Sequence, residues 1–229
     1  MRRSRQPAPT PVPFSPHAAR AHRAGLGLTP DQVAEGMAAN GVRLLPAHVL
    51  GWESGAIRPT EEEFIALARA LWCPPAQLMG AAPSSLRDFR VARELGQEEA
   101  ARRLGLSTRG YAAAESTGRW SGDEAQTFAL AELLGLTLRD LIRVTGTGEE
   151  LEQRLRQCVD GRWQGQLKAV ARLVPVDREV LAAALAALQN EYQVPSYWGS
   201  AAEEEPRPTE PLERRFWTLL AGMRTVLPV

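Results

Sequence analysis

The residues that best suggest chemistry are Thr108 and Arg109, at the start of a short helix expected to begin after Ser107. Helical spacing directs both side chains away from the core side, which Tyr111 and Ala114 would occupy. An arginine guanidinium is a planar fork of donors that matches the O6 and N7 acceptors of guanine. A helix with such an exposed side, preceded by a turn and another helix, has the layout that places one helix in the DNA major groove.

Residues 97–116 fit the helix-turn-helix pattern position by position. Ala101 is small, which allows the two helices to cross closely. Gly105 stands at the turn, where a residue without a Cβ can take a positive φ. Ser107 is a favourable N-cap for the second helix. With Tyr111 and Ala114 facing the core, the outward positions are Thr108, Arg109, Ala112 and Ala113.

The same pattern occurs earlier in the chain, where residues 29–34 lead to residues 49–53. Ala34 matches Ala101 at an offset of 67. At an offset of 62, Val49 matches Tyr111 and Glu53 matches Glu115. Residues 67–71 match residues 130–134 at an offset of 63. Three blocks that agree in the same order indicate internal duplication. The first copy has five additional residues between its two central helices.

The first copy departs further from the pattern. It begins well, with Thr29 as an N-cap, Pro30 at the first helical position and Gln32 completing a capping box. Its second helix, residues 45–53, would turn Pro46, Ala47, Leu50 and Gly51 outward, and its nearby polar candidates are Arg43 and His48. Two interpretations stay open: this helix contacts thymine methyl groups, or it no longer reads bases.

At these positions the chain resembles the Xre, or lambda-repressor-like, family of five-helix DNA-binding domains, over residues 17–80 and 86–145. The residues that carry the resemblance are Gln97, Ala101, Gly105, Ser107 and Glu115. The resemblance implies sequence-specific binding of double-stranded DNA, usually as a homodimer on inverted half-sites.

Roles for individual residues follow from this resemblance. Gln97 would bond a phosphate and brace the recognition helix, Arg109 would contact a base edge, and Thr108 would contact a base or a phosphate. Arg119, just after the helix, is placed for a backbone phosphate. The candidate DNA-binding set is Gln97, Ser107, Thr108, Arg109, Ala112, Ala113 and Arg119, with Arg43 and His48 from the first copy.

No alternating strand pattern is visible, so the expected fold class is all-α: two tandem lambda-repressor-like domains followed by a C-terminal helical region. The expected parts are a flexible basic arm rich in proline (1–16), a first helix-turn-helix domain (17–80), a second one (86–145), a helical C-terminal domain (149–199), and an acidic linker with a final amphipathic helix (200–229). Residues 80–85 would link the two copies.

The amino-acid composition limits the classes of function that the chain can have. The chain has 27 basic and 27 acidic residues, although five arginines and no acid fall within residues 1–30. Two cysteines without metal-ligand spacing, and no apolar run of membrane length, favour a cytoplasmic protein with no membrane contact. The three histidines do not cluster with acids or a nucleophile. No enzyme, cofactor or metal site is therefore expected.

These observations predict a bacterial-type transcription regulator, a repressor more readily than an activator. Arg2, Arg3 and Arg5 could enter the minor groove, or could simply be a charged tail. The C-terminal helices suit dimerisation or a small-molecule or protein effector, although leucine stripes more often form an intramolecular core. The alternative function is a helix-turn-helix scaffold used for protein interaction or ligand sensing, which net neutrality and the apolar helix at 45–53 favour.

Overall fold

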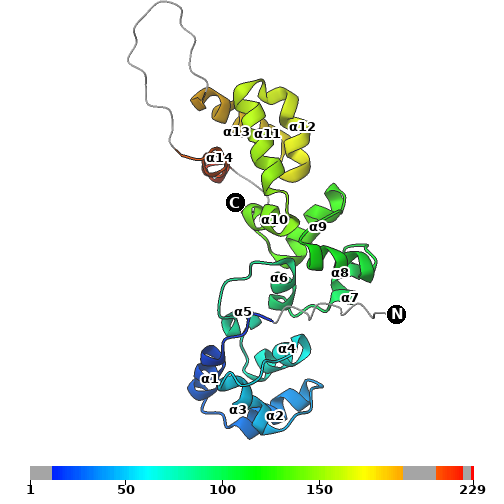
Figure 1. Ribbon diagram of the computed structural model, residues 1–229, viewed down its shortest axis with the longest axis vertical. Coiled ribbons are helices and arrows are strands. Elements are labelled where there is room, and N and C mark those ends of the chain that lie inside the picture. Colours follow the sequence, from blue (N-terminus) through cyan, green and yellow to red (C-terminus); the bar gives the residue numbers. More distant parts are fainter. Residues whose placement is uncertain (1–11, 193–209, 224–227) are drawn as a thin grey trace, which may run out of the picture. The chain divides into compact units, whose positions relative to one another are not determined.

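A computed structural model of the chain describes residues 12–192, 210–223 and 228–229. The described residues form fourteen helices and no strand (Figure 1), which confirms the all-α fold class. The chain divides into two compact units, residues 1–100 and residues 101–229. The tandem DNA-binding domains stay a prediction.

The first unit contains six complete helices, which carry the first copy of the motif and the start of the second. They are α1 (Pro16–Gly25), α2 (Pro30–Ala39), α3 (Pro46–Glu53), α4 (Glu61–Ala70), α5 (Pro75–Leu78) and α6 (Leu86–Ala92). The next helix, α7 (Gln97–Arg103), crosses the boundary between the units. The boundary between the two compact units therefore lies within α7.

The second unit carries the rest of the second copy and the C-terminal helices. They are α8 (Thr108–Thr117), α9 (Glu124–Leu134), α10 (Leu138–Thr145), α11 (Gly148–Asp160), α12 (Trp163–Leu173), α13 (Arg178–Tyr192) and α14 (Leu212–Ala221). In the described part of the chain, no helix combines the length and the apolar composition that crossing a bilayer requires.

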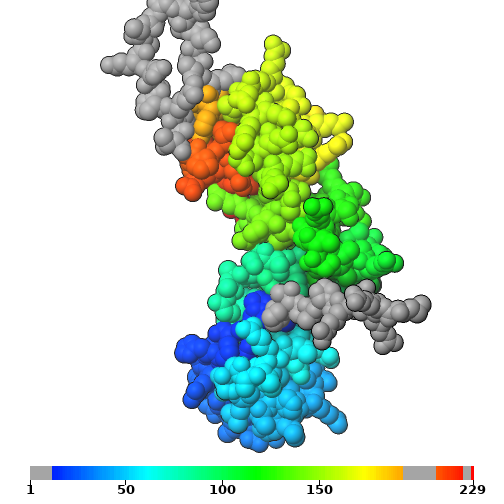
Figure 2. Space-filling model, viewed as in Figure 1, coloured from blue at the N-terminus to red at the C-terminus, as the bar shows by residue number. Residues whose placement is uncertain are grey.

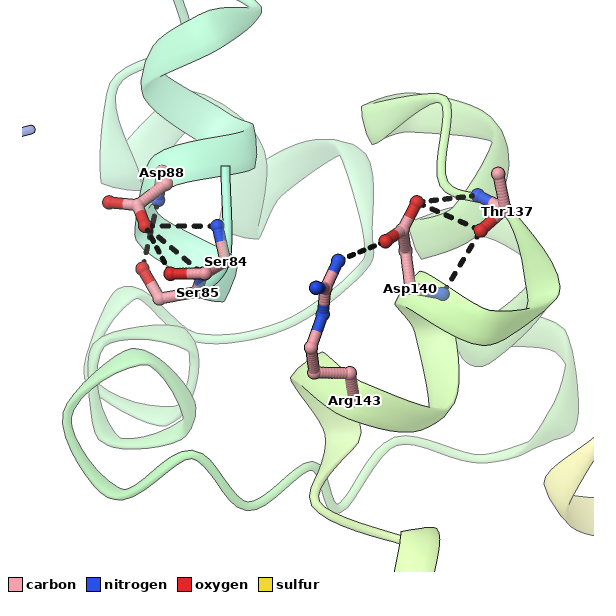
Figure 3. A network of polar contacts seen from close by, with 6 residues as sticks. All are labelled: Ser84, Ser85, Asp88, Thr137, Asp140 and Arg143. Atoms are coloured by element: carbon pink, nitrogen blue, oxygen red, sulfur yellow. Dashed lines mark hydrogen bonds and ion pairs between the residues drawn. The ribbon is translucent and has the colours of Figure 1, made fainter. Parts of the chain in front are cut away.

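Many helices begin at a reciprocal cap that the sequence makes readable. The predicted capping box of α2 is present, since Thr29 accepts from the Gln32 N–H while the Gln32 side chain accepts from the Thr29 N–H. Figure 3 shows the same device in α6, where Ser85 and Asp88 cap each other, and in α10, where Thr137 and Asp140 do so. Each cap satisfies N–H groups that a helix start leaves without partners.

Residues 12–16 differ from the flexible arm expected there. Val12 and Phe14 are buried, and the Phe14 ring meets Phe64 of α4 edge to face at a centroid distance of 6.1 Å. Ser15 donates its N–H to the Leu78 carbonyl at 2.8 Å and caps α1, with Pro16 at the first helical position, where proline costs no hydrogen bond. The arginines of the expected arm, Arg2, Arg3 and Arg5, lie outside the described residues.

Helices α11 to α14 pack on one another in the second unit, and Figure 2 shows α14 (orange-red) directly against α11 (yellow-green). Apolar residues that recur at helical spacing in α11 and α13 are buried between them, namely Leu151, Leu155, Cys158, Leu181, Leu185 and Leu188, whereas Val159 and Val180 of the same pattern are half-buried. Arg215 of α14 also holds Glu191 of α13 through two contacts of 2.7 Å. The buried leucines of these stripes therefore form an intramolecular core among the described residues. The expected acidic linker lies largely outside the described residues, since only 210 and 211 of it are described.

Candidate nucleic-acid interface

The turn between α7 and α8 has the geometry that the sequence predicts. Gly105 has a φ of 65°, in the left-handed region that glycine tolerates best. The N–H of Leu106 then reaches back to the carbonyl of Ala101 at 2.9 Å, which closes the end of α7. Ala101 is buried, as its small size predicts. The direction of α8 is thus set by a tight turn with hydrogen bonds back to α7.

Helix α8 begins at a capped residue and packs on two side chains. The Ser107 hydroxyl accepts from the Gly110 N–H at 3.1 Å, which confirms Ser107 as the N-cap. Tyr111 and Ala114 are buried, as predicted. Because these two positions are three residues apart, they lie on one side of the helix and fix which side faces outward.

The outward side of α8 is polar and lacks acids over its first turn. Thr108, Arg109 and Ala113 are exposed, and Ala112 is half-buried. A hydroxyl and a guanidinium therefore stand together at the start of the helix, beside two small residues that add no bulk. Such a surface can approach a flat polar edge closely and donate hydrogen bonds to it.

Arg119 lies in the turn after α8, between Gly118 and Trp120, which both fix the course of the backbone. Gly118 has a φ of 64°, and the N–H of Trp120 donates to the Thr145 carbonyl at 3.2 Å. The Trp120 indole N–H donates to the Thr127 hydroxyl at 2.8 Å. Arg119 itself is exposed, so its guanidinium projects from an anchored turn in the same unit as α8.

Gln97 is the remaining candidate of the second copy and stands on the helix that precedes α8. It is the first residue of α7, it is half-buried, and it lies in the first unit. Ser107, Thr108, Arg109, Ala112, Ala113 and Arg119 lie in the second unit, and Gln97 stands three residues before the boundary, which runs through α7 itself.

Helix α3 offers a different surface. Its N-cap position is Leu45, which makes no capping hydrogen bond and is 67% exposed. The imidazole Nδ1 of His48 lies 3.2 Å from the Leu45 carbonyl oxygen, so this ring folds onto its own helix start. Arg43 is exposed in the segment before the helix. The two polar candidates of the first copy thus flank an uncapped, apolar helix start.

The exposed side of α3 continues as an apolar patch, which we define as Leu45, Leu50 and Ile57. Leu50 is 51% exposed and Ile57 is 44% exposed. A Cβ at Gly51 would lie 2.9 Å from Cγ1 of Ile57, so glycine at 51 is what allows Ile57 to pack on the helix. Helical spacing predicts the outward position of Leu50, but it does not single out Leu45 or Ile57. Leu45 could have been found from the repeat, because at the offset of 62 it matches Ser107, the exposed N-cap of the second copy.

The end of α3 contributes to packing and to the turn that follows. Trp52 is buried in the first-unit core, and Gly55 makes the turn with a φ of 75°. Glu53 accepts two hydrogen bonds from Arg23 of α1, at 2.6 and 2.8 Å. The hydrogen bond with Glu53 raises the pKa of Arg23, although burial opposes the shift.

Arg90 is a residue whose role the sequence does not reveal directly. Its side chain is fully buried, although arginine is a residue type that usually lies on the surface. It donates to the Leu95 carbonyl at 2.7 Å and pairs with Glu61 at 2.9 Å. The sequence does contain a related pattern, since Arg23 and Leu28 of the first copy match Arg90 and Leu95 at the offset of 67. In the structure Arg23 donates in the same way to the Leu28 carbonyl at 2.8 Å.

Glu61, at the start of α4, is the acid that Arg87 and Arg90 of α6 share. Burial alone would raise the pKa of Glu61, but the hydrogen bond from Arg87 and the charge of Arg90 outweigh it and leave the pKa below its usual value. This pair of contacts ties α6 to the first copy of the motif.

Comparison of the chain with protein-family models, with curated proteins and with solved structures finds no match. Among the described residues, no group of three or more His, Cys, Asp or Glu side chains is placed to hold a metal ion. The exposed surfaces of α3 and α8 are therefore the candidates for a functional site.

Proposed function

We propose that this chain is a sequence-specific regulator of transcription that binds double-stranded DNA through α8. The observation that carries the proposal is the exposure of Thr108 and Arg109 on the first turn of α8, opposite the buried Tyr111 and Ala114. The proposed contacts are a base edge for Arg109, a base or phosphate for Thr108, and a backbone phosphate for Arg119.

Three features support the proposal. The turn at Gly105 and the cap at Ser107 give α8 a defined direction. Its first turn lacks acids that would repel phosphate. The residues that carry the resemblance to the Xre family include this turn and this cap. The proposal extends to a homodimer on inverted half-sites and to repression, since a bound protein blocks polymerase without further surfaces.

The test begins with selection of a DNA site from random duplexes by the purified chain. Affinity for the selected site is then measured against salt concentration for the parent and for two variants. Arg109→Ala should lose about 1–3 kcal/mol of discrimination at one base position. Arg119→Ala should lower the affinity for all duplex sequences alike. It should also make the slope of log affinity against log salt concentration shallower by about 0.9, the value for one phosphate contact.

A matched control removes the same charge elsewhere. Arg172 is exposed on α12, so Arg172→Ala should leave the affinity, the discrimination and the salt slope unchanged. The proposal fails if no duplex is enriched, or if Arg109→Ala and Arg119→Ala bind like the parent.

The apolar patch of α3 favours a second candidate function, docking of a second copy of this chain. Leu45, Leu50 and Ile57 are all exposed, and an apolar patch is self-complementary across a two-fold axis. In this candidate function the first copy of the motif pairs two chains, and the second copy is left to bind another molecule.

Sedimentation equilibrium tests this docking without DNA. Leu50→Glu should convert a dimeric parent to a monomer, because it buries a charge in the contact. Phe128→Glu is the control, since Phe128 is an exposed apolar residue of α9 and not of the patch. A parent that is monomeric at high concentration, or a dimer unaffected by Leu50→Glu, rules this contact out.

A further inference from the structure

The turn after α8 holds the backbone of Arg119 from two directions. On the side of α8, the N–H of Arg119 donates to the Thr117 hydroxyl at 3.3 Å. That hydroxyl donates in turn to the Ala113 carbonyl at 2.8 Å. On the other side, the N–H of Trp120 donates to the carbonyl of Thr145, the last residue of α10. The arginine therefore stands between a bond to its own helix and a bond to α10.

The side chain of Trp120 anchors the same turn to a further helix. Its indole N–H donates to the Thr127 hydroxyl of α9 at 2.8 Å, and this hydroxyl donates onward to the Asp123 carbonyl at 2.7 Å. Trp120 is half-buried and Thr127 is buried, so water competes little for the bond. The backbone and the side chain of one residue thus fasten the turn to two different helices.

Two glycines allow the close packing around this turn. A Cβ at Gly146, directly after α10, would lie 2.5 Å from the carbonyl oxygen of Gly118. A Cβ at Gly122 would lie 2.5 Å from Cζ2 of the Trp120 indole. Both distances are too short for a real side chain, so the turn would have to shift to accept one. The end of α10 and the indole therefore both lie tightly against the turn.

The first copy of the motif lacks the residues of this arrangement. At the offset of 63, which aligns the turn glycines Gly55 and Gly118, three positions hold an apolar residue instead: Ala56 for Arg119, Ile57 for Trp120 and Phe64 for Thr127. The N–H of Ile57 donates to the Gly51 carbonyl of its own helix α3 at 3.3 Å. The arginine, the indole and the hydroxyl thus occur together in the copy whose helix is proposed to bind DNA.

The guanidinium of Arg119 is available to an external partner. It is exposed, and among the described residues it makes no hydrogen bond or ion pair. A phosphate that approaches it meets a cation whose backbone is already held in place. The conformational freedom lost on binding is then smaller than for an arginine on a loose loop, which favours affinity.

We propose that Trp120 and Thr127 are positioning residues for the contact between Arg119 and a DNA phosphate. The proposal rests on the proposed function, duplex binding through α8, and adds two residues that act on it through the backbone of Arg119. Packing of the turn requires an aromatic ring at position 120. Positioning requires in addition the indole N–H and the buried hydroxyl that receives it.

Two variants remove this hydrogen bond from either side. Trp120→Phe keeps a ring without the indole N–H, and Thr127→Val keeps the volume without the hydroxyl. Each should lower the affinity for the selected duplex about three- to tenfold, because Arg119 must then be ordered on binding. Each should also make the slope of log affinity against log salt concentration shallower, by up to about 0.9, the value for one phosphate contact. Urea unfolding checks that both variants are folded.

A double-mutant cycle with Arg119→Ala separates positioning from general stabilisation. Once Arg119 is replaced, Trp120→Phe should change neither the affinity nor the slope further, because both substitutions act on the same contact. If Trp120→Phe instead lowers the affinity equally in both backgrounds and leaves the slope unchanged, Trp120 only stabilises the fold and the proposal is overturned. Trp163→Phe makes the same change at a half-buried tryptophan of α12 and is the matched control, with parental affinity and slope expected.

Amide hydrogen exchange of the free protein gives a readout without DNA. The N–H of Trp120 should exchange slowly in the parent and faster in Thr127→Val, because loss of the side-chain anchor loosens the turn. Unchanged exchange overturns the proposal. If Arg119→Ala lowers the affinity while Trp120→Phe and Thr127→Val bind like the parent, the positioning role is wrong and duplex binding stands. If no duplex is enriched, the proposed function fails and the positioning role fails with it.

Discussion

Helices α3 and α8 occupy matching positions in the two copies of the motif, yet they expose different chemistry. At the offset of 62, Leu45 corresponds to Ser107 and Ala47 to Arg109. The α8 side is capped and polar, whereas the α3 side is uncapped and carries the apolar patch. The comparison shows that two helices at matching positions of the repeated sequence pattern present different outward residues.

The buried positions explain why both copies keep the scaffold. Val49 and Trp52 are buried in α3, and their counterparts Tyr111 and Ala114 are buried in α8. The volumes differ, but each pair is apolar and three residues apart, so each helix docks by the same side. Exposed positions carry no such constraint.

The largest expected effect tests whether the buried sides are equivalent. Trp52→Ala and Tyr111→Ala should each lower the free energy of unfolding by about 3–5 kcal/mol, because each leaves a cavity in a packed core. Urea unfolding followed by circular dichroism measures this. Leu50→Ala, on the exposed side of α3, should change stability by less than about 0.5 kcal/mol. A loss of similar size in Leu50→Ala would contradict the assignment of sides.

The next effect concerns the acids at the start of α4 and α9. Glu61 is held by Arg87 and Arg90, whereas its counterpart at the offset of 63, Glu124, is exposed. Because the pKa of folded Glu61 is lowered, its ionised form stabilises the fold above the unfolded pKa, and this contribution is lost as the pH falls through the folded pKa.

Glu61→Gln should therefore cost about 1–2 kcal/mol near neutral pH, and the difference from the parent should shrink below about pH 4.5. Glu124→Gln is the matched control and should show almost no difference at any pH. The free energy of unfolding is measured from pH 3 to pH 8 for the parent and both variants. If Glu61→Gln loses the same stability at every pH, the ionised carboxylate of Glu61 is not the cause of the loss.

A smaller effect is expected at the helix starts. Leu45 and Ser107 have similar extended backbones, with φ of −84° and −71°, so serine fits at 45 without rearrangement. Leu45→Ser should stabilise the first unit by about 1 kcal/mol, and Ser107→Ala should destabilise by a similar amount. Thermal unfolding of both variants is the measurement. If Leu45→Ser destabilises the protein, the Leu45 side chain contributes more to the free energy of unfolding than an N-cap hydrogen bond would.

The smallest effect is expected from Ala47→Arg, which places an arginine on α3 at the position of Arg109. If α3 does not approach DNA, the salt dependence of duplex binding should stay that of the parent. A slope steeper by about 0.9 would instead place α3 beside a phosphate. This variant therefore sharpens the contrast between the two helices, with Arg119→Ala as the opposite change on the α8 side.

The local features of this protein were predictable from the sequence by itself. Caps, turns and helix sides depend on residues within four positions of one another, so Thr29, Gly105 and Ser107 could be assigned without a tertiary structure. The outward position of Thr108 and Arg109 followed from the same spacing. The assignment of DNA to that surface stays a prediction.

Only the tertiary structure decided which side chains are buried by distant parts of the chain. Arg90 is buried because Glu61, 29 positions earlier, supplies its counter-charge. Phe14 is buried because Phe64 meets it, despite its proline-rich surroundings. Trp72 is exposed although tryptophan usually packs inside. Burial depends on what folding brings alongside a residue, and periodicity along one helix does not contain that information.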